Sequence, residues 1–140
     1  MACAIGIDYG SKRVGVAITD ALGIIASPLG TWHSAELVEM LKKLVPEKKV
    51  SVIVVGQPKQ LSGAPTDASK MTDEFCVHLS RVFPQVRIDR VDERFTSSMA
   101  AKSLVENGIP KKKRQDKALL DAVSAAIILQ SWLDSPASKL

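Results

Sequence analysis

The sequence predicts an α/β protein with a mixed five-stranded sheet and helices on both faces. Two observations lead to this fold class. Three strand-like segments joined by tight turns open the chain, which is typical of an antiparallel meander. Two later strand-like segments alternate with amphipathic helices, which is typical of strands added in parallel. The 140 residues fit one domain, expected over 1–134, with a frayed tail at 135–140.

The opening segment, CAIGIDYGSKRVGVAITD (3–20), has two apolar runs rich in β-branched residues around Gly-Ser-Lys-Arg. This pattern predicts a β-hairpin in which Gly10 supplies the backbone freedom of the turn. A third strand is expected at 24–31, after a turn at Gly23.

Ser34 is the expected N-cap of a helix that Pro46 ends. The continuous apolar run at 50–55 predicts a strand buried on both faces, and 56–66 is expected to be a loop.

The second half of the chain alternates between helix and strand patterns. We expect a helix over 71–82, a half-buried strand over 86–91 and a helix from Thr96 or Ser97 to about Val105. The last helix is expected over 117–133 and is apolar on nearly all sides.

The composition is that of an ordinary globular protein, with 46% hydrophobic and 24% charged residues. The apolar runs are too short to span a membrane, and no secretory signal opens the chain. Cys3 and Cys76 form no CxxC pair, which argues against zinc and against a disulfide scaffold. We therefore expect a reduced, cytoplasmic setting.

The formal net charge of +4 is concentrated in one segment. Residues 107–117 carry five basic side chains against Asp116 and so hold a net charge of +4 themselves. The basic residues are Lys111, Lys112, Lys113, Arg114 and Lys117. A local basic patch favours binding to a polyanion, although a solvated loop is an equal alternative.

Three carboxylates stand where apolar residues are expected. Asp8 ends an apolar strand, Glu93 follows the strand at 86–91, and Asp121 lies inside the apolar last helix. A lone buried charge is costly, so each needs a partner or a metal. Glu93 could instead belong to a surface turn, and Asp121 could form a buried salt bridge with an arginine.

Ligands of open sheets gather at the carboxyl ends of parallel strands, so Asp8 and Glu93 could converge. Several carboxylates suit Mg²⁺ or Mn²⁺, and a pair of such ions is the arrangement that hydrolyses phosphodiesters. The basic segment before Asp121 could hold a polynucleotide beside them.

Four motifs together resemble the YqgF/RuvX family: GIDYGSKRVGVAITD (6–20), VVGQP (54–58), DERFTS (92–97) and LDAVSAAIILQ (120–130). These are small bacterial RuvC-like proteins of the ribonuclease H-like fold. They are regarded as Holliday-junction-resolvase-like proteins or as nucleases that process the 5′ end of pre-16S rRNA. The first motif alone also looks like the phosphate loop of actin-like ATPases.

The resemblance implies that Asp8, Glu93 and Asp121 are metal-binding catalytic acids. It also implies that Lys12, Arg13 and Arg94 contact phosphates. Gln57 and Phe95 depart from the family pattern, which bears on substrate fit and not on the chemistry.

The expected function is therefore divalent-metal-dependent endonuclease activity on structured nucleic acid, first of all at the 5′ end of pre-16S rRNA. Two alternatives remain: a Holliday junction resolvase acting on branched DNA, and a nucleic-acid-binding factor without catalysis. A resolvase would be a homodimer, whereas an rRNA nuclease could be a monomer. An actin-like ATPase requires two related halves, which a 140-residue chain without a repeat does not supply.

Overall fold

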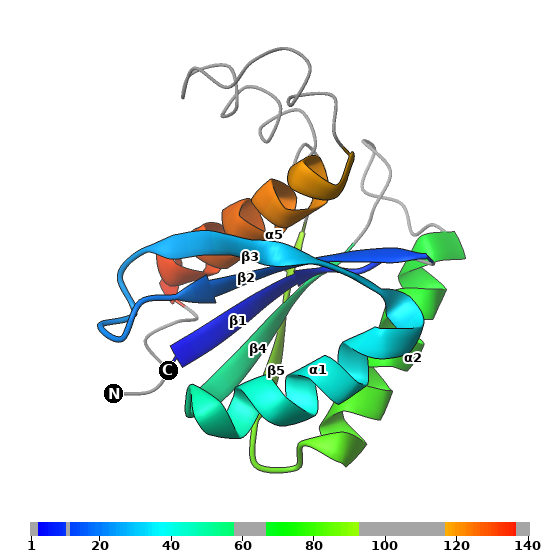
Figure 1. Ribbon diagram of the computed structural model, residues 1–140, viewed down its shortest axis with the longest axis horizontal. Helices are drawn as coiled ribbons and strands as arrows, with labels where there is room; N and C mark the ends of the chain where they lie inside the picture. The colour runs from blue at the N-terminus through cyan, green and yellow to red at the C-terminus, as the bar shows by residue number, and fades with distance from the viewer. Residues whose placement is uncertain (1–2, 11, 58–66, 93–116, 137–140) are drawn as a thin grey trace.

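The computed structural model describes residues 3–10, 12–57, 67–92 and 117–136. The strands in this part are β1 (Cys3–Asp8), β2 (Arg13–Thr19), β3 (Ala26–His33), β4 (Val50–Gln57) and β5 (Arg87–Asp92). The helices are α1 (Ser34–Glu47), α2 (Asp67–Val82) and α5 (Lys117–Leu133). Helices α1 and α2 cover one face of the sheet, and α5 covers the other (Figure 1).

The sheet is mixed, with the strand order β3-β2-β1-β4-β5. Strands β1, β2 and β3 form an antiparallel meander, whereas β4 pairs in parallel with β1 and β5 in parallel with β4. This confirms the predicted fold class. Because β1 and β4 are central and parallel, their carboxyl ends lie at the same edge of the sheet, where Asp8 ends β1.

The two faces of β1 carry different side chains. Cys3, Ile5 and Ile7 belong to the core that α1 and α2 complete, whereas Ala4 packs in the second core against α5. Side chains alternate between faces along a strand, so Asp8 continues the series of Ala4 and projects on the α5 side.

Helix α5 is tied to the sheet at both ends by side-chain hydrogen bonds. At its start, the hydroxyl of Thr31 on β3 donates to the carbonyl oxygen of Ala118 at 2.7 Å. Near its end, the side-chain oxygen of Gln130 accepts from the amide of Ala26 at 3.0 Å. These contacts fix how far α5 can slide along the sheet.

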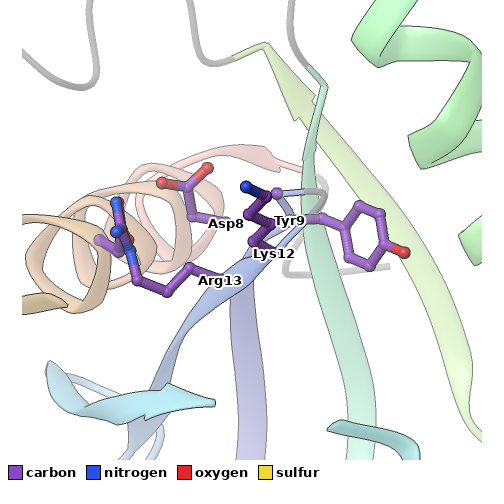
Figure 2. Close-up of a pocket in the computed structure, with 6 residues that line it drawn as sticks. Asp8, Tyr9, Lys12 and Arg13 are labelled. Carbon is purple, nitrogen blue, oxygen red and sulfur yellow. The ribbon is translucent and has the colours of Figure 1, made fainter. Parts of the chain in front are cut away.

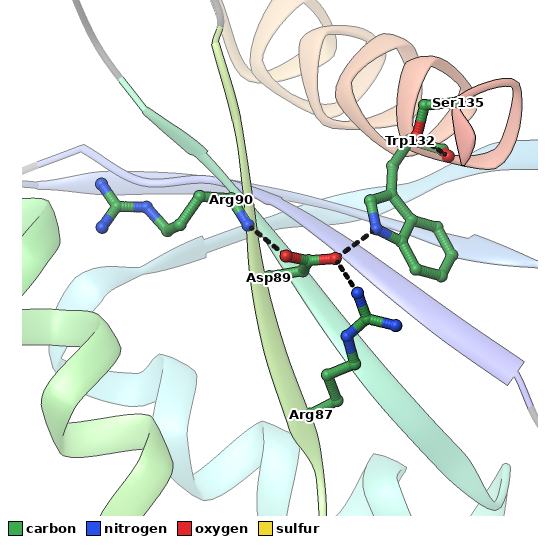
Figure 3. A network of polar contacts seen from close by, with 5 residues as sticks. All are labelled: Arg87, Asp89, Arg90, Trp132 and Ser135. Atoms are coloured by element: carbon green, nitrogen blue, oxygen red, sulfur yellow. Dashed lines mark hydrogen bonds and ion pairs between the residues drawn. The ribbon is translucent and has the colours of Figure 1, made fainter. Parts of the chain in front are cut away.

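A polar network at the far end of α5 joins it to the edge strand β5 (Figure 3). The indole Nε1 of Trp132 donates to Oδ2 of Asp89 at 2.6 Å, and Arg87 donates to the same oxygen at 2.8 Å. The backbone amide of Arg90 donates to the other carboxylate oxygen. Asp89 therefore holds three donors.

Three local expectations from the sequence were wrong. The N-cap of α1 is His33, whose Nδ1 accepts from the amide of Ala35, and not Ser34. Pro46 lies within α1, one residue before its end at Glu47, so the helix stops just after the proline and not before it. Strand β3 starts at Ala26 because the carboxylate of Asp20 holds the amides of residues 24 and 25 in the turn.

The predicted loop at 56–66 begins later than expected. Gly56 and Gln57 still belong to β4, where they pair with Val91 and Asp92 of β5. The expected helix at 96–105 lies outside the described residues. In the described part of the chain, no helix has the length and apolar character needed to cross a membrane.

Replacing Trp132 by phenylalanine should lower the free energy of unfolding by about 2–3 kcal/mol, because a hydrogen bond to a carboxylate and part of the buried indole ring are lost. Urea denaturation followed by circular dichroism measures the change. In a double-mutant cycle with Asp89→Asn, the combined loss should be smaller than the sum of the single losses. Simple additivity would show that the two side chains do not stabilise the fold together.

Candidate active site

A pocket of about 310 Å³ opens at the carboxyl end of β1 (Figure 2). It is lined by Asp8, Tyr9, Gly10, Lys12, Arg13 and Asp121. Four of these residues are among those singled out from the sequence, namely Asp8, Lys12, Arg13 and Asp121. The structure therefore brings two of the three expected acids together with two of the expected basic residues.

The β1–β2 turn places Asp8 and the basic residues on one side of the pocket. Gly10 is required there for space and not for a positive φ, since a Cβ would lie 2.5 Å from the carbonyl oxygen of Arg13. In Figure 2 the side chains of Asp8 and Arg13 point toward α5, whereas the ring of Tyr9 points away from them.

Gly15 determines how Asp121 reaches this turn. Gly15 pairs directly with Asp8 across the β1–β2 ladder. A Cβ on Gly15 would lie 2.0 Å from the carbonyl oxygen of Asp121, so the helix backbone rests on the strand backbone here. The bare strand thus allows Asp121 to approach the level of Asp8.

The position of Asp121 within α5 follows from the helical repeat. Asp121 lies four residues before Ala125 and eight before Leu129, and both of these are buried against the sheet. Residues four apart share one face of a helix, so Asp121 continues the sheet-facing row. The row passes from apolar to acidic where α5 reaches the pocket.

Arg13 forms an ion pair with Asp121, its Nε donating to Oδ2. The side chains are 46% and 25% exposed, so this pair borders the pocket and is open to solvent. The alternative expectation of a salt bridge with an arginine was correct in its partner and wrong in its burial. Solvent screens a pair that is partly exposed on both sides, so its contribution to stability is modest and does not by itself explain the contact.

Tyr9 anchors the end of β1 to the opposite face of the sheet. Its ring stacks on that of Phe75 in α2, with centroids 4.1 Å apart and planes inclined by 16°. Burial raises the pKa of the Tyr9 phenol further above its ordinary value, which already leaves the hydroxyl neutral at neutral pH. The stack restrains the backbone beside Asp8 and puts no charge into the pocket.

The donor set of the pocket fits a hard divalent cation. Carboxylate oxygens are the ligands that Mg²⁺ and Mn²⁺ prefer, and Mg²⁺ sites commonly use only one or two of them. A cationic group, the Arg13 guanidinium, already lies against Asp121. The described residues contain no cluster of three metal-ligating side chains, and Glu93 is outside them.

Several other residues expected at the site also lie outside the described part of the chain. They are Arg94, Lys111, Lys112, Lys113 and Arg114. Lys117 begins α5, and its side chain is outside the described part of the structure. Their roles stay predictions.

Two residues that shape the pocket were missed from the sequence. From the sequence, Gly15 is expected only to be part of a strand, and Tyr9 only to be part of the first motif. The alternation of β2 carried a signal for the first, because Val14 and Val16 are buried on the α1 and α2 face while Arg13 and Gly15 face the other way. The stack of Tyr9 on Phe75 joins distant segments and has no local signal.

Comparison with solved structures identifies the fold. The Fowlpox virus resolvase in complex with Holliday junction DNA matches with a TM-score of 0.60 at 9% identity, over 94% of this chain and 97% of that chain. Thermus thermophilus RuvC with a Holliday junction matches with a TM-score of 0.54 at 14% identity, over 95% and 94%. The chain therefore has the ribonuclease H-like fold of these resolvases.

Sequence comparison gives the family. The family model described as "RuvX: Holliday junction resolvase" matches residues 2–135, and the chain belongs to this family. A "Putative pre-16S rRNA nuclease" of Flavobacterium johnsoniae is 44% identical over 94% of this chain and 95% of its own length. A protein of the same name from Christiangramia forsetii is 46% identical over 95% and 98%.

Replacing Gly15 by alanine should lower the free energy of unfolding by roughly 1–3 kcal/mol, because two backbones must separate to admit the methyl group. Urea denaturation gives the loss, and the backbone amide signals of residues 121 and 122 should move in a ¹H–¹⁵N spectrum.

Gly6→Ala is the matched control. Its Cβ would lie 2.6 Å from that of Leu129 and 2.7 Å from the carbonyl oxygen of Ala125, farther along the same helix. It should also destabilise the fold, but with signal changes centred on residues 125 and 129. Unmoved signals at 121 in Gly15→Ala would contradict the positioning role of Gly15.

Proposed function

We propose that this protein is a divalent-metal-dependent endonuclease that processes the 5′ end of pre-16S rRNA. The observation that carries the proposal is the meeting of Asp8 and Asp121 in one pocket beside Lys12 and Arg13. Two acids suit a cation and two basic groups suit a phosphate, which are the components of phosphodiester hydrolysis. The names of the relatives supply the rRNA substrate.

In this proposal Asp8, Asp121 and Glu93 hold one or two Mg²⁺ or Mn²⁺ ions. A bound divalent cation supplies Lewis-acid stabilisation of negative charge on the phosphate ester. The β1 ladder fixes the backbone of Asp8 and the contact of α5 with Gly15 fixes that of Asp121, so neither backbone has to be reorganised on binding. Such preorganisation is the main protein contribution to electrostatic catalysis.

Lys12 and Arg13 would contact the oxygens of the scissile phosphate. Both side chains are exposed and line the pocket with Asp8. In this proposal, hydrolysis adds water across the P–O3′ bond and leaves a 5′-phosphate and a 3′-hydroxyl. The extra charge that develops on the phosphate oxygens is stabilised by these two cationic groups.

Cleavage of a Holliday junction is the second candidate function, because the family description and the fold neighbours refer to junction resolvases. A resolvase needs two active sites and therefore a dimer. The decisive experiment incubates the protein with a pre-16S 5′ precursor RNA and with a four-way DNA junction, each in Mg²⁺ and in EDTA. Mg²⁺-dependent cleavage of the RNA alone supports the rRNA function, and binding of both without cleavage supports a non-catalytic factor.

Asp8→Asn should reduce Mg²⁺-dependent cleavage by more than about a hundredfold, beyond the usual effect of a residue that only supports a metal ligand. The amide keeps the shape of the side chain, so the melting temperature should be unchanged or higher once carboxylate repulsion is relieved. Asp134→Asn is the control, because Asp134 lies just past α5 and away from the pocket. Near wild-type cleavage by Asp8→Asn would remove Asp8 from the mechanism.

Neutralising Lys111, Lys112, Lys113 and Arg114 together should weaken binding to every nucleic acid and flatten its salt dependence. Lysine contacts to phosphates carry affinity without base information. The slope of log affinity against log salt should fall by up to about 3 for four lost contacts. An unchanged slope would indicate that the basic segment is only a solvated loop.

A further inference from the structure

The ion pair between Arg13 and Asp121 joins two residues with opposite tasks in the proposed mechanism. Asp121 is proposed to bind a cation and Arg13 a phosphate, yet in the ligand-free protein they bind each other. They are 108 positions apart in the sequence, and the contact forms at the mouth of the pocket. A partly exposed ion pair contributes only modestly to the stability of the fold, so stability alone does not explain why these two residues pair.

We propose that Arg13 is an exchangeable counter-ion that couples divalent-cation binding to phosphate binding. This inference rests on the function proposed above. Without metal, the guanidinium neutralises Asp121 and binds the carboxylate oxygen at which the cation would bind. When a divalent cation binds Asp121, Arg13 leaves that carboxylate and becomes available to the phosphate of the substrate.

The exchange follows from charge and geometry. Nε of Arg13 donates a hydrogen bond to Oδ2 of Asp121. A divalent cation at the same carboxylate would repel the guanidinium and compete for this oxygen. Because both side chains remain partly exposed, Arg13 can swing into solvent without unfolding any packed element.

A substrate phosphate in the pocket would give Arg13 a second anionic partner in place of Asp121. Arg13 lies next to Lys12 on the β1–β2 turn, and both line the pocket with Asp8. A guanidinium matches the oxygens of a phosphate with two parallel hydrogen bonds, as it matches those of a carboxylate. Arg13 can therefore exchange one anion for the other by a rotation of its side chain.

Coupling of this kind must be reciprocal. If the cation frees Arg13 and so tightens substrate binding, then bound substrate must tighten cation binding by the same factor. The protein would hold metal loosely until nucleic acid arrives. Lys12 serves as the comparison, because no ion pair joins it to any carboxylate of the described residues.

The test measures binding of a fluorescein-labelled stem–loop RNA by anisotropy, in EDTA and in saturating Mg²⁺, with the RNA checked for integrity. Arg13→Gln should weaken binding about tenfold in Mg²⁺, the equivalent of one lost charged hydrogen bond, and less than about twofold in EDTA. Lys12→Gln should weaken binding by a similar factor in both conditions. An equal loss for Arg13→Gln in Mg²⁺ and EDTA would overturn the exchange.

A second measurement uses Mn²⁺ alone, without RNA. Because Arg13→Gln removes the competitor of the cation, its Mn²⁺ dissociation constant should fall about two- to fivefold, the equivalent of an exposed ion pair. Lys12→Gln removes the same charge from the pocket and should have a smaller effect. In wild-type protein, the Nε–H signal of Arg13 should be protected from solvent exchange and should lose this protection as Mg²⁺ is added.

The outcomes separate this inference from the proposed function. If Asp8→Asn binds Mn²⁺ like the wild type, the metal site is wrong and both proposals fall. If Mn²⁺ binding and cleavage depend on Asp8 but Arg13→Gln matches Lys12→Gln in every measurement, only the exchange falls. A circular dichroism melt of each variant shows that it is folded, and Arg13→Lys should restore part of the Mg²⁺-dependent affinity.

Discussion

The contact between α5 and the first two strands sets the position of nearly everything else around the pocket. Helix and strand backbones meet where Gly15 lies under Asp121, and a single methyl group would not fit between them. The hydrogen bonds from Thr31 and to Gln130 hold the helix in this register. Since the pair Asp8 and Gly15 is fixed by the β1–β2 ladder, one packing contact aligns an acid of the strand with an acid of the helix.

Most of the fold could be predicted because its signals are local. The hairpin, the buried run of β4 and the apolar α5 each follow from periodicity within one segment, and their order gave the mixed sheet. Two of the errors lie where a side chain binds a backbone amide. The carboxylate of Asp20 accepts hydrogen bonds from the amides of residues 24 and 25, so these residues stay in the turn and β3 starts later. His33 is the N-cap that was expected at Ser34.

Four residues of the pocket could be predicted from the sequence, but their contacts could not. Asp8 and Asp121 stand out because a carboxylate in an apolar element is costly to bury, and the pocket does contain both. Nothing local to Arg13 indicates that its partner lies 108 residues away, and the stack of Tyr9 on Phe75 is equally remote. Such contacts depend on how α5 and α2 dock, and docking between distant segments leaves no pattern in the local sequence.

The order of the elements along the chain has a consequence for synthesis. Asp8 belongs to the first strand made and Asp121 to the last helix, and α5 alone covers its face of the sheet in the described structure. A growing chain therefore carries the first acid long before the second, and the small residues under α5 stay bare until that helix docks. The pocket that both acids line therefore forms only after α5 has been made and has docked. Under the proposed function, the protein would acquire its nuclease site only when α5 docks on the sheet.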